Sequence, residues 1–185
     1  DHLVRAWFHT YNFPILITNC SNNFGPWQFP EKLIPLVISM ALEGRKIPIY
    51  GDGLNVRDWL YVEDHIEALL LVIQKGVIGK SYCIGGYGER NNKFIVKLIC
   101  SILDKRIPSN APHSKLIEYV SDRPGHDKRY SINSAKIQNE LGWKSNFKLE
   151  ESIEKTVDWY LDNYDWVKKI KAKSKYVGER IGKIN

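Results

Sequence analysis

Residues 15–38 read ILITNCSNNFGPWQFPEKLIPLVI, and this stretch decides the fold class. Ile15-Leu16-Ile17 is a short apolar run after Pro14, which is typical of a strand buried on both faces. Residues 18–29 are rich in Asn, Gly and Pro and predict a long loop, which usually serves a function because ordering it costs entropy. In open α/β sheets the loops after the carboxyl ends of strands form the ligand crevice, so we expect residues 18–29 to line one.

Helices are predicted on both sides of this strand and loop. Before the strand, Leu3, Trp7 and Tyr11 form one helical stripe that ends at Asn12. After the loop, a helix is expected to begin near Pro30 and to end at Gly44. Glu31 suits its first turn, and its face is formed by Leu33, Leu36, Val37 and Met40.

The remaining sequence alternates between strand and helix patterns. Strands are predicted over residues 47–50, 56–62, 82–84 and 116–120, and helices over 63–76, 93–104, 134–142 and 149–161. Asn92 is expected to cap the helix over 93–104, and Asn133 or Ser134 the next one. In the helix over 63–76, the residues expected to face the core are Ile66, Leu69, Leu70 and Ile73. The chain is therefore α/β, with the end of a doubly wound Rossmann-type parallel sheet followed by a smaller mixed α/β domain.

The composition is that of an ordered globular chain. Of its 185 residues, 43% are hydrophobic and 12% aromatic, which argues against disorder. No stretch approaches the roughly 20 apolar residues that span a bilayer, so no membrane partner is expected. The three widely spaced cysteines, Cys20, Cys83 and Cys100, form no metal or redox motif and favour reduced thiols in a cytoplasmic protein. The first residue is Asp1 and not Met, so we expect the natural N-terminus to be missing.

The net charge of +6 is concentrated near the end of the chain. Its basic residues after Trp166 are Lys168, Lys169, Lys171, Lys173, Lys175, Arg180 and Lys183. A basic tail can bind polyanions, but this one lacks the interleaved aromatic residues and the fold signature of specific nucleic-acid binding. A solvated helical end or tail is the favoured interpretation, and no nucleic-acid partner is expected.

The common catalytic and phosphate-binding motifs are not found. There is no G-x-G-x-x-G after a strand, no G-x-S-x-G, no H-E-x-x-H and no P-loop. Gly85-Gly86-x-Gly88 comes nearest to a phosphate loop, but its spacing favours a simple turn. The five histidines include no pair at i, i+4, so a metal site is not expected.

Two polar clusters suit an anionic, hydroxyl-rich ligand. Residues 18–23, Thr-Asn-Cys-Ser-Asn-Asn, offer amide donors and acceptors for sugar hydroxyls, or equally for their own backbone. Residues 122–130, DRPGHDKRY, hold three basic side chains, a histidine and two carboxylates around a Pro-Gly turn. Arg123 and His126 could face a diphosphate there, and a solvated charged loop is the alternative.

Arg57 stands out because it interrupts an extended apolar segment. A guanidinium fork can bind two phosphate oxygens at once. The residues alone favour an internal ion pair with Asp58 or Asp64 instead.

Taken together, these segments resemble the dTDP-glucose 4,6-dehydratase family of the extended short-chain dehydrogenases/reductases, the NAD-dependent epimerases and dehydratases. The strings that carry the resemblance, in order, are TNCSNNFGPWQFPEKLIPLVI (18–38), PIYGDGLNVRDWLYVEDH (48–65), IGG (84–86), DRPGHDKRY (122–130), ELGW (140–143) and TVDWYLDN (156–163). The resemblance runs from Asp1 to about Trp166. Phe24 and Trp27 stand where the family pattern has tyrosines, Cys83 where it has Asn, and Tyr87-Gly88 where it has His-Asn.

The resemblance implies an activity for the parent protein. A Rossmann domain would hold NAD, and a smaller C-terminal domain would hold dTDP-glucose. Oxidation at C4, loss of water across C5 and C6, and return of the hydride to C6 would yield dTDP-4-dehydro-6-deoxyglucose, a precursor of rhamnose and other deoxysugars. The family's catalytic Tyr-x-x-x-Lys pair and Asp-Glu dyad would precede Asp1, so we expect no catalytic residue in this chain and no activity from the chain alone.

The resemblance also assigns binding residues and domains. Asn23 would contact NAD, and the substrate contacts would be Asn22, Glu31, Lys32, Leu33, Pro48, Ile49, Tyr50, Arg57, Asn92, Asp122, Arg123 and His126. Residues 1–30 would be the last helix, strand and loop of the Rossmann domain, 31–166 the sugar-nucleotide-binding domain, and 167–185 a basic tail or terminal helix. The parent would be a homodimer. A non-catalytic remnant or binding domain, or another nucleotide-sugar dehydratase or epimerase of the superfamily, is the alternative.

Overall fold

The structure, a computed structural model, describes residues 1–174. Its helices are α1 His2–Tyr11, α2 Leu33–Leu42, α3 Val62–Lys75, α4 Asn92–Arg106, α5 Ala135–Leu141, α6 Leu149–Asp162 and α7 Tyr164–Ser174, with 3-10 turns at Pro108–Asn110 and His113–Leu116. Its strands are β1 Ile17–Cys20, β2 Asn22–Phe24, β3 Ile47–Tyr50, β4 Val56–Tyr61, β5 Ser81–Ile84, β6 Glu89–Asn91, β7 Ile117–Val120 and β8 Arg129–Tyr130. The predicted α/β class is confirmed.

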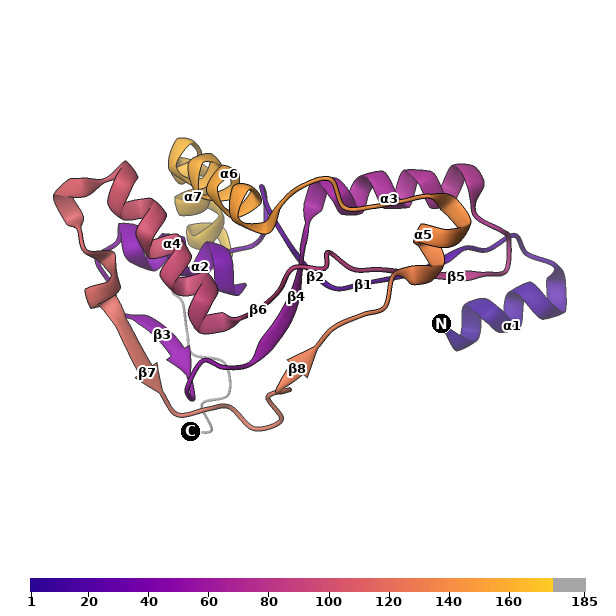
Figure 1. The fold of residues 1–185 in the computed structure, drawn as a ribbon, viewed down its shortest axis with the longest axis horizontal. Coiled ribbons are helices and arrows are strands. Elements are labelled where there is room, and N and C mark those ends of the chain that lie inside the picture. Colours follow the sequence, from indigo (N-terminus) through magenta and orange to yellow (C-terminus); the bar gives the residue numbers. More distant parts are fainter. Residues whose placement is uncertain (175–185) are drawn as a thin grey trace.

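The strands form three small sheets along an elongated molecule. β1 and β5 pair in parallel, as do β3 and β7. In the central sheet β4 pairs in parallel with β2 and β8 and antiparallel with β6. Figure 1 shows α2, α4, α6 and α7 gathered at one end with β3 and β7, and α1, α3 and α5 at the other end beside β1 and β5.

Two hydrophobic cores correspond to these two ends. The larger is built mainly from α2, α4 and α6, whose fully buried residues include Ile34, Ile38, Ile95, Ile99, Leu103, Ile153 and Val157. The smaller contains Leu60, Ala68, Val72, Tyr82, Ile84, Ile137 and Trp143. Each Å² of apolar surface that is buried stabilises a fold by about 25 cal/mol, so these two cores are the main stabilising contribution. The central β4 contributes to both, and so fixes the two ends to each other.

The strand and loop at residues 15–29 differ from the prediction. β1 begins at Ile17 and extends through Thr18–Cys20, and the expected loop contains the further strand β2. The reason is tertiary pairing, since Thr18, Asn19 and Cys20 lie opposite Tyr82, Cys83 and Ile84 of β5. Backbone pairing with a neighbouring strand overrides the turn preference of Asn and Ser.

Two predicted helix starts were also wrong by a few residues. α2 begins at Leu33 with Lys32 in extended conformation as its N-cap, so Glu31 lies outside the helix. α4 begins at Asn92, and its cap is Asn91, whose side chain accepts a hydrogen bond from the Phe94 backbone N–H. The next helix follows Ser134, but the side chain that accepts a backbone N–H there is that of Asn133.

Of the four residues of 63–76 predicted to face the core, Leu69 packs against the smaller core and the other three point away from it. Ile66, Leu70 and Ile73 are at least half exposed, whereas Ala68 and Val72 are buried. α3 therefore turns its smaller residues inward, toward β5. The stripe on α1 is likewise exposed, and no residue of that helix is buried.

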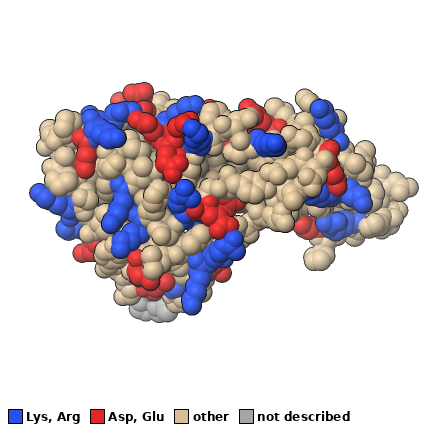
Figure 2. All heavy atoms as spheres, viewed as in Figure 1, with Lys and Arg blue, Asp and Glu red and all other residues tan. Residues whose placement is uncertain are grey.

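The predicted terminal helix exists as α7, of which Val167 is buried. Its basic side chains are partly paired, since Lys168 contacts Asp165 at 2.6 Å and Lys171 contacts Glu43 at 2.6 Å. Figure 2 shows Lys and Arg interspersed with Asp and Glu over the visible face. The remaining basic residues, Lys175, Arg180 and Lys183, lie outside the described residues.

Candidate functional site

The amide-rich segment, residues 18–23, extends from β1, of which only Ile17 is buried, into β2. Its parallel pairing with β4 places Asn22 opposite Trp59 and Asn23 opposite Leu60. The side-chain oxygens Oδ1 of Asn22 and Asn23 are buried and have no hydrogen-bond partner within residues 1–174. Since buried polar atoms are almost always hydrogen-bonded, these two acceptors point to a ligand that donates to them. The segment also satisfies part of its own backbone, because Asn23 Nδ2 donates to the Ser21 carbonyl oxygen at 3.2 Å.

Arg57 reaches the same region from β4 and is only 8% exposed. Its Nη1 donates to the backbone oxygens of Val56 at 2.7 Å and of Asp127 at 2.9 Å. The predicted ion pair of Arg57 with Asp58 or Asp64 was wrong. Both carboxylates accept hydrogen bonds from backbone N–H groups elsewhere in the molecule.

A polar pocket of about 360 Å³ lies between these groups. It is lined by Cys20, Ser21, Asn22, Arg57, Arg123, Asp127 and Tyr130. Burial lowers the pKa of Arg57, the negative charge of Asp127 partly offsets this, and the positive charge of Arg123 lowers it further. The guanidinium groups of Arg57 and Arg123 thus place two positive charges at one pocket, because an arginine remains protonated under all ordinary conditions. Such an arrangement favours a phosphate or diphosphate.

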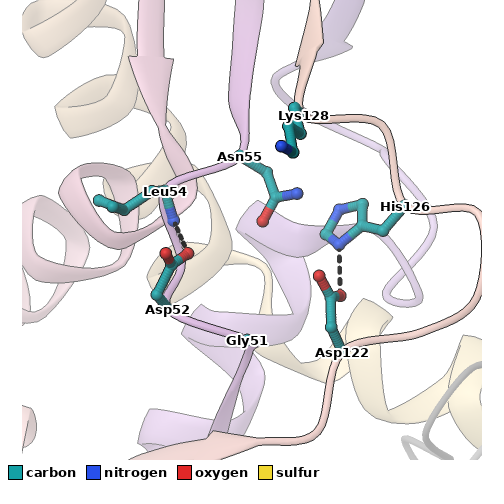
Figure 3. Close-up of a pocket in the computed structure, with 7 residues that line it drawn as sticks. All are labelled: Gly51, Asp52, Leu54, Asn55, Asp122, His126 and Lys128. Carbon is teal, nitrogen blue, oxygen red and sulfur yellow. Dashed lines mark hydrogen bonds and ion pairs between the residues drawn. The ribbon is translucent and has the colours of Figure 1, made fainter.

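The Pro-Gly loop forms a second pocket beside the first, of about 420 Å³ (Figure 3). Its lining residues are Gly51, Asp52, Leu54, Asn55, Asp122, His126 and Lys128. Nδ1 of His126 lies 2.7 Å from Oδ1 of Asp122, which also accepts the Arg123 backbone N–H at 2.8 Å. The hydrogen bond with His126 lowers the pKa of Asp122, so this carboxylate is charged when it orients the imidazole. Most residues of the loop 122–130 are solvent-exposed, Arg123 and His126 are half-buried, and this hydrogen bond organises the loop locally.

The two pockets are joined through one carbonyl group. The backbone oxygen of Asp127 accepts from Arg57 of the first pocket and from Asn55 Nδ2 of the second, at 2.9 and 3.2 Å. Asn22, Arg57 and Arg123 therefore share one pocket, and Asp122 and His126 line the next. The two polar clusters and the buried arginine predicted from the sequence meet at one region of the surface.

The strand β3 supplies one wall of this region. Its parallel partner β7 ends at Val120, opposite Tyr50, which brings Asp122 close to Gly51. A Cβ on Gly51, whose φ is +58°, would lie 3.2 Å from the Asp122 carboxylate, so glycine permits this close approach. The Tyr50 ring meets the His126 ring edge-on at 6.4 Å. Ile49 is buried at 2% exposure, so only its backbone is available to a ligand, and Pro48 lies opposite Glu118.

The other predicted contacts line neither of the two pockets. Asn92 begins α4, and its backbone N–H donates to the Asn55 carbonyl oxygen at 3.1 Å. Glu31 and Lys32 line neither of the two pockets and pair with each other at 2.7 Å. Leu33 packs against the larger core.

Several pocket residues were not singled out from the sequence. Asn55 and Lys128 line the second pocket, and Tyr130 lines the first. The signal for Asp52 was present, because an Asp-Gly pair is typical of a turn, and its Oδ1 accepts the Leu54 backbone N–H at 2.9 Å. Lys128 belongs to the charged cluster predicted at residues 122–130, but nothing in the local pattern of Asn55 indicates a pocket, since the pocket depends on β8 pairing with β4 far along the chain.

The turn at Gly85-Gly86-x-Gly88 binds a carboxylate of the protein itself. The backbone N–H groups of Gly86 and Gly88 donate to Asp58 at 3.1 and 3.0 Å. A Cβ on Gly86 would lie 2.2 Å from the Trp59 carbonyl oxygen. The prediction that this segment is a turn and not a phosphate loop is consistent with these contacts.

Residues 1–174 contain neither a metal-binding cluster nor a membrane-spanning helix. No group of three or more His, Cys, Asp or Glu side chains in that range could hold a metal ion. None of its helices has the length and hydropathy needed to cross a bilayer.

The parallel sheets and the polar pockets at their strand ends define a class, an α/β protein of the NAD-dependent epimerase and dehydratase type. The sequence model of one family in this class, described as GDP-mannose 4,6 dehydratase, matches residues 1–156. The chain therefore belongs to that family.

Relatives and solved structures agree with this assignment. The chain is 55% identical to a dTDP-glucose 4,6-dehydratase of Shigella flexneri over 172 residues, which cover 93% of this chain and 48% of the relative. It is 53% identical to one from Xanthomonas campestris, covering 98% of this chain and 52% of the relative. The chain thus spans about half the length of the curated relatives it matches. The resemblance stated from the sequence is confirmed.

Two crystal structures match the fold. A dTDP-glucose 4,6-dehydratase from Bacillus anthracis, in complex with NAD, is 47% identical with a TM-score of 0.83, covering 92% of this chain and 52% of that one. One from Streptomyces venezuelae, also with NAD bound, is 38% identical with a TM-score of 0.86, covering 92% and 51%.

Proposed function

We propose that this chain is the C-terminal, sugar-nucleotide-binding portion of a dTDP-glucose 4,6-dehydratase, which converts dTDP-glucose to dTDP-4-dehydro-6-deoxyglucose and water. One observation carries the proposal. Arg57 and Arg123 act on the pocket where the unpartnered amide oxygen of Asn22 is buried. Cations for a diphosphate and an acceptor for a hydroxyl donor are the groups that a nucleotide sugar requires.

The second pocket would hold the nucleoside. The backbone of Pro48 and Ile49 and the Tyr50 ring would flank it, while the Asp122–His126 pair and Asn92 would contact the ribose or diphosphate. Glu31, Lys32 and Leu33, at the N-terminal end of α2, would lie against the ligand. Support for this arrangement comes from the parallel pairing of β3 and β7, which sets Tyr50 beside His126.

We infer that NAD is bound mainly by residues that this chain does not contain, with Asn23 as a contact from this side. The buried, unpartnered Oδ1 of Asn23 fits a hydrogen-bond donor of the cofactor. NAD, when bound, would accept and return a hydride. In this chain we assign binding and orientation only, and no catalytic residue.

The domain division proposed from the sequence assigns residues 1–30 to the Rossmann domain, 31–166 to substrate binding and 167–185 to a terminal helix or tail. The exposed apolar residues of α1 and α3, at one end of the molecule, support a covering by further protein there. They include Leu3, Trp7, Tyr11, Ile66, Leu70 and Ile73. A homodimeric parent and a cytoplasmic location complete the proposal, and the three cysteines, which form no disulfide, are in keeping with it.

Calorimetric titration of the purified chain with dTDP, UDP and GDP tests the binding role. We expect dTDP to bind more tightly than UDP or GDP, because the chain is 55% and 53% identical to two dTDP-glucose 4,6-dehydratases. Preferred binding of GDP would favour a GDP-sugar dehydratase, the second candidate, which the name of the matching family supports. Mixing the chain with NAD and dTDP-glucose is expected to yield no 4-keto sugar, and turnover would contradict the absence of catalytic residues. Binding without turnover even after the N-terminal half of a relative is supplied would favour a non-catalytic remnant.

A further inference from the structure

We propose that Trp27 is a positioning residue that holds the segment bearing Asn22 and Asn23 in its binding conformation by anchoring it to α6 and α7. The ligand named in this inference rests on the proposed function. The structural role of Trp27 does not depend on it. Asn22 and Asn23 belong to the short strand β2, and only two residues, Gly25 and Pro26, separate Phe24 from the Trp27–Gln28 pair.

The backbone of Trp27 is in an unfavourable conformation. Its φ is +64°, in the left-handed region that glycine adopts readily and bulky side chains rarely do. Such conformations persist only when the surrounding structure fixes them, and they concentrate at functional sites. Burial in a core is not what fixes this one, because Trp27 is 62% exposed.

Two other tryptophans hold the Trp27 ring. Its centroid lies 4.8 Å from that of Trp159 in α6 and 5.2 Å from that of Trp166 in α7, both in edge-on geometry. Trp159 and Trp166 also meet each other edge-on at 5.6 Å. Edge-on aromatic pairs at these distances are attractive beyond the area they bury. We call these three residues the tryptophan cluster.

A chain of hydrogen bonds runs from α6 to the same segment. The hydroxyl of Tyr160 donates to the Gln28 backbone oxygen at 2.6 Å, and Gln28 Nε2 donates to the Asn23 backbone oxygen at 2.8 Å. Tyr160 is 1% exposed and is held in the larger core. The position of Asn23 is thus set from α6 through Gln28, the immediate neighbour of Trp27.

The support on the α7 side is itself fixed. Lys171 pairs with Glu43 at 2.6 Å, the Tyr164 hydroxyl donates to Glu43 at 3.0 Å, and Val167 is 1% exposed. These contacts fasten α7 to the end of α2. Trp166 therefore stands on a helix that cannot move independently of the rest of the molecule.

Exposure of the cluster also allows a different role, a docking surface for another protein. The positive φ and the hydrogen bonds through Gln28 favour positioning, because a docking surface requires neither. At the other end of the segment, a Cβ added to Gly25 would lie 2.5 Å from Val62 Cγ1. The segment is therefore constrained at both ends. Without Trp27, the two asparagines would be held by the pairing of β2 with β4, by this tight turn and by Gln28.

Three substitutions at Trp27 distinguish the contribution of its ring from that of its strained backbone. Trp27→Phe retains an aromatic ring, Trp27→Ala removes the ring and retains the unfavourable φ, and Trp27→Gly removes both. Hydrogen exchange of residues 19–29 in the whole chain is the first measurement, because it requires no ligand. We expect exchange at least about tenfold faster in the Ala and Gly variants and within about twofold of the parent in the Phe variant. Unchanged exchange in Trp27→Ala, or parent-like exchange in Trp27→Gly, would overturn the proposal.

Calorimetry with dTDP is the second measurement, made on the same proteins. Trp27→Ala is expected to weaken binding about tenfold, and this loss should vanish in an Asn22→Ala background if Trp27 acts through Asn22. Trp143→Phe is the matched control, because Trp143 is 4% exposed in the smaller core and should affect thermal stability without affecting affinity. Equal losses in both backgrounds would show that Trp27 does not act through Asn22. If the parent chain binds no dTDP, the proposed function fails, and the exchange result alone decides the positioning role.

Discussion

Nδ1 of His126 lies 2.7 Å from Oδ1 of Asp122, four residues earlier in the same loop, and the same oxygen accepts the Arg123 backbone N–H. Oδ1 of Asp122 therefore fixes two groups. One is the imidazole of His126, which lines the second pocket, and the other is the backbone N–H of Arg123, whose side chain lines the first. Because the hydrogen bond with His126 lowers the pKa of Asp122, the carboxylate retains its charge through the mildly acidic range. The loop is organised locally and does not depend on a ligand for its shape.

Asp122→Ala should weaken dTDP binding about as much as His126→Ala does. The reason is that the carboxylate orients the imidazole, so both substitutions remove the same oriented group. We expect a comparable loss for each, roughly a fivefold change in dissociation constant. The double variant should lose little more than either single one, which calorimetry on all four proteins can measure. Additive losses would mean that the two side chains contact the ligand independently.

Protonation of Glu43 should weaken the attachment of α7. Burial would raise the pKa of Glu43, but hydrogen bonds from Lys171, Arg45 and Tyr164 outweigh it and lower the pKa from 4.5 to about 2. A carboxyl whose folded-state pKa is depressed contributes stability above its unfolded pKa, and this contribution is lost as the pH falls through the folded value. The stabilisation by Glu43 is therefore complete above about pH 5 and declines toward pH 2.

Urea unfolding of the parent chain and of Glu43→Gln, compared between about pH 6 and pH 3, measures this contribution. The difference in unfolding free energy between the two proteins should be largest near pH 6 and should shrink toward pH 3. Glu140→Gln is the matched control, because Glu140 is exposed on α5, and its difference should stay flat. A pH-independent difference for Glu43→Gln would contradict the ion-pair explanation.

Much of the fold followed from periodicity and turn residues. The strand Ile47–Tyr50 and the helix ending before Gly142 lie where apolar spacing and glycine placed them. Pairing between distant segments did not follow, because local preference carries no information about partners. Thr18–Cys20 form a strand only because β5 lies beside them, and the inward face of α3 is set by Ala68 and Val72 for the same reason.

The candidate site likewise has parts that the sequence predicts and parts that depend on pairing between distant segments. The clusters at residues 18–23 and 122–130 were found because several polar or charged residues stand close together in sequence. Arg57 was recognised as unusual, but its partner was assigned wrongly, since the sequence favoured neighbouring carboxylates and the structure supplies the Asp127 carbonyl oxygen, 70 residues away. Asn55 gave no signal, because a single polar residue in a polar segment acquires a role only through the fold.

Asp58 is expected to be essential for stability and not for binding. Its carboxylate is 1% exposed and accepts the backbone N–H groups of Gly86 and Gly88. Asp58→Ala would leave two buried donors unsatisfied, at a cost of about 2–4 kcal/mol. Urea unfolding should show this loss. The control is Asp158→Ala, which removes an exposed ion pair with Arg106 and should cost about 1 kcal/mol or less. Similar small losses for both variants would show that water replaces the carboxylate at the turn.

Arg57→Ala and Arg123→Ala should each weaken dTDP binding by about 1.5–3 kcal/mol, the typical worth of a hydrogen bond to a charged group. That range corresponds to roughly a 10- to 150-fold change in dissociation constant. Calorimetry at low and at high salt distinguishes the two residues, since Arg57 is buried and Arg123 is more exposed. Salt should reduce the effect of Arg123→Ala more strongly, because screening acts mainly on exposed charges.

Two further variants separate the geometry of the guanidinium group from its charge. Arg57→Lys retains the charge but loses the fork that binds two oxygens, so its affinity should fall between those of the parent and Arg57→Ala. Arg106→Ala removes an arginine that pairs with Glu154 and Asp158 and lines neither pocket, so it should leave the affinity unchanged. If Arg57→Lys binds as well as the parent, a simple charge is enough at this position. If Arg106→Ala weakens binding as much as Arg57→Ala, the attraction is a general effect of net charge, and the shared pocket of Arg57 and Arg123 is not the diphosphate site.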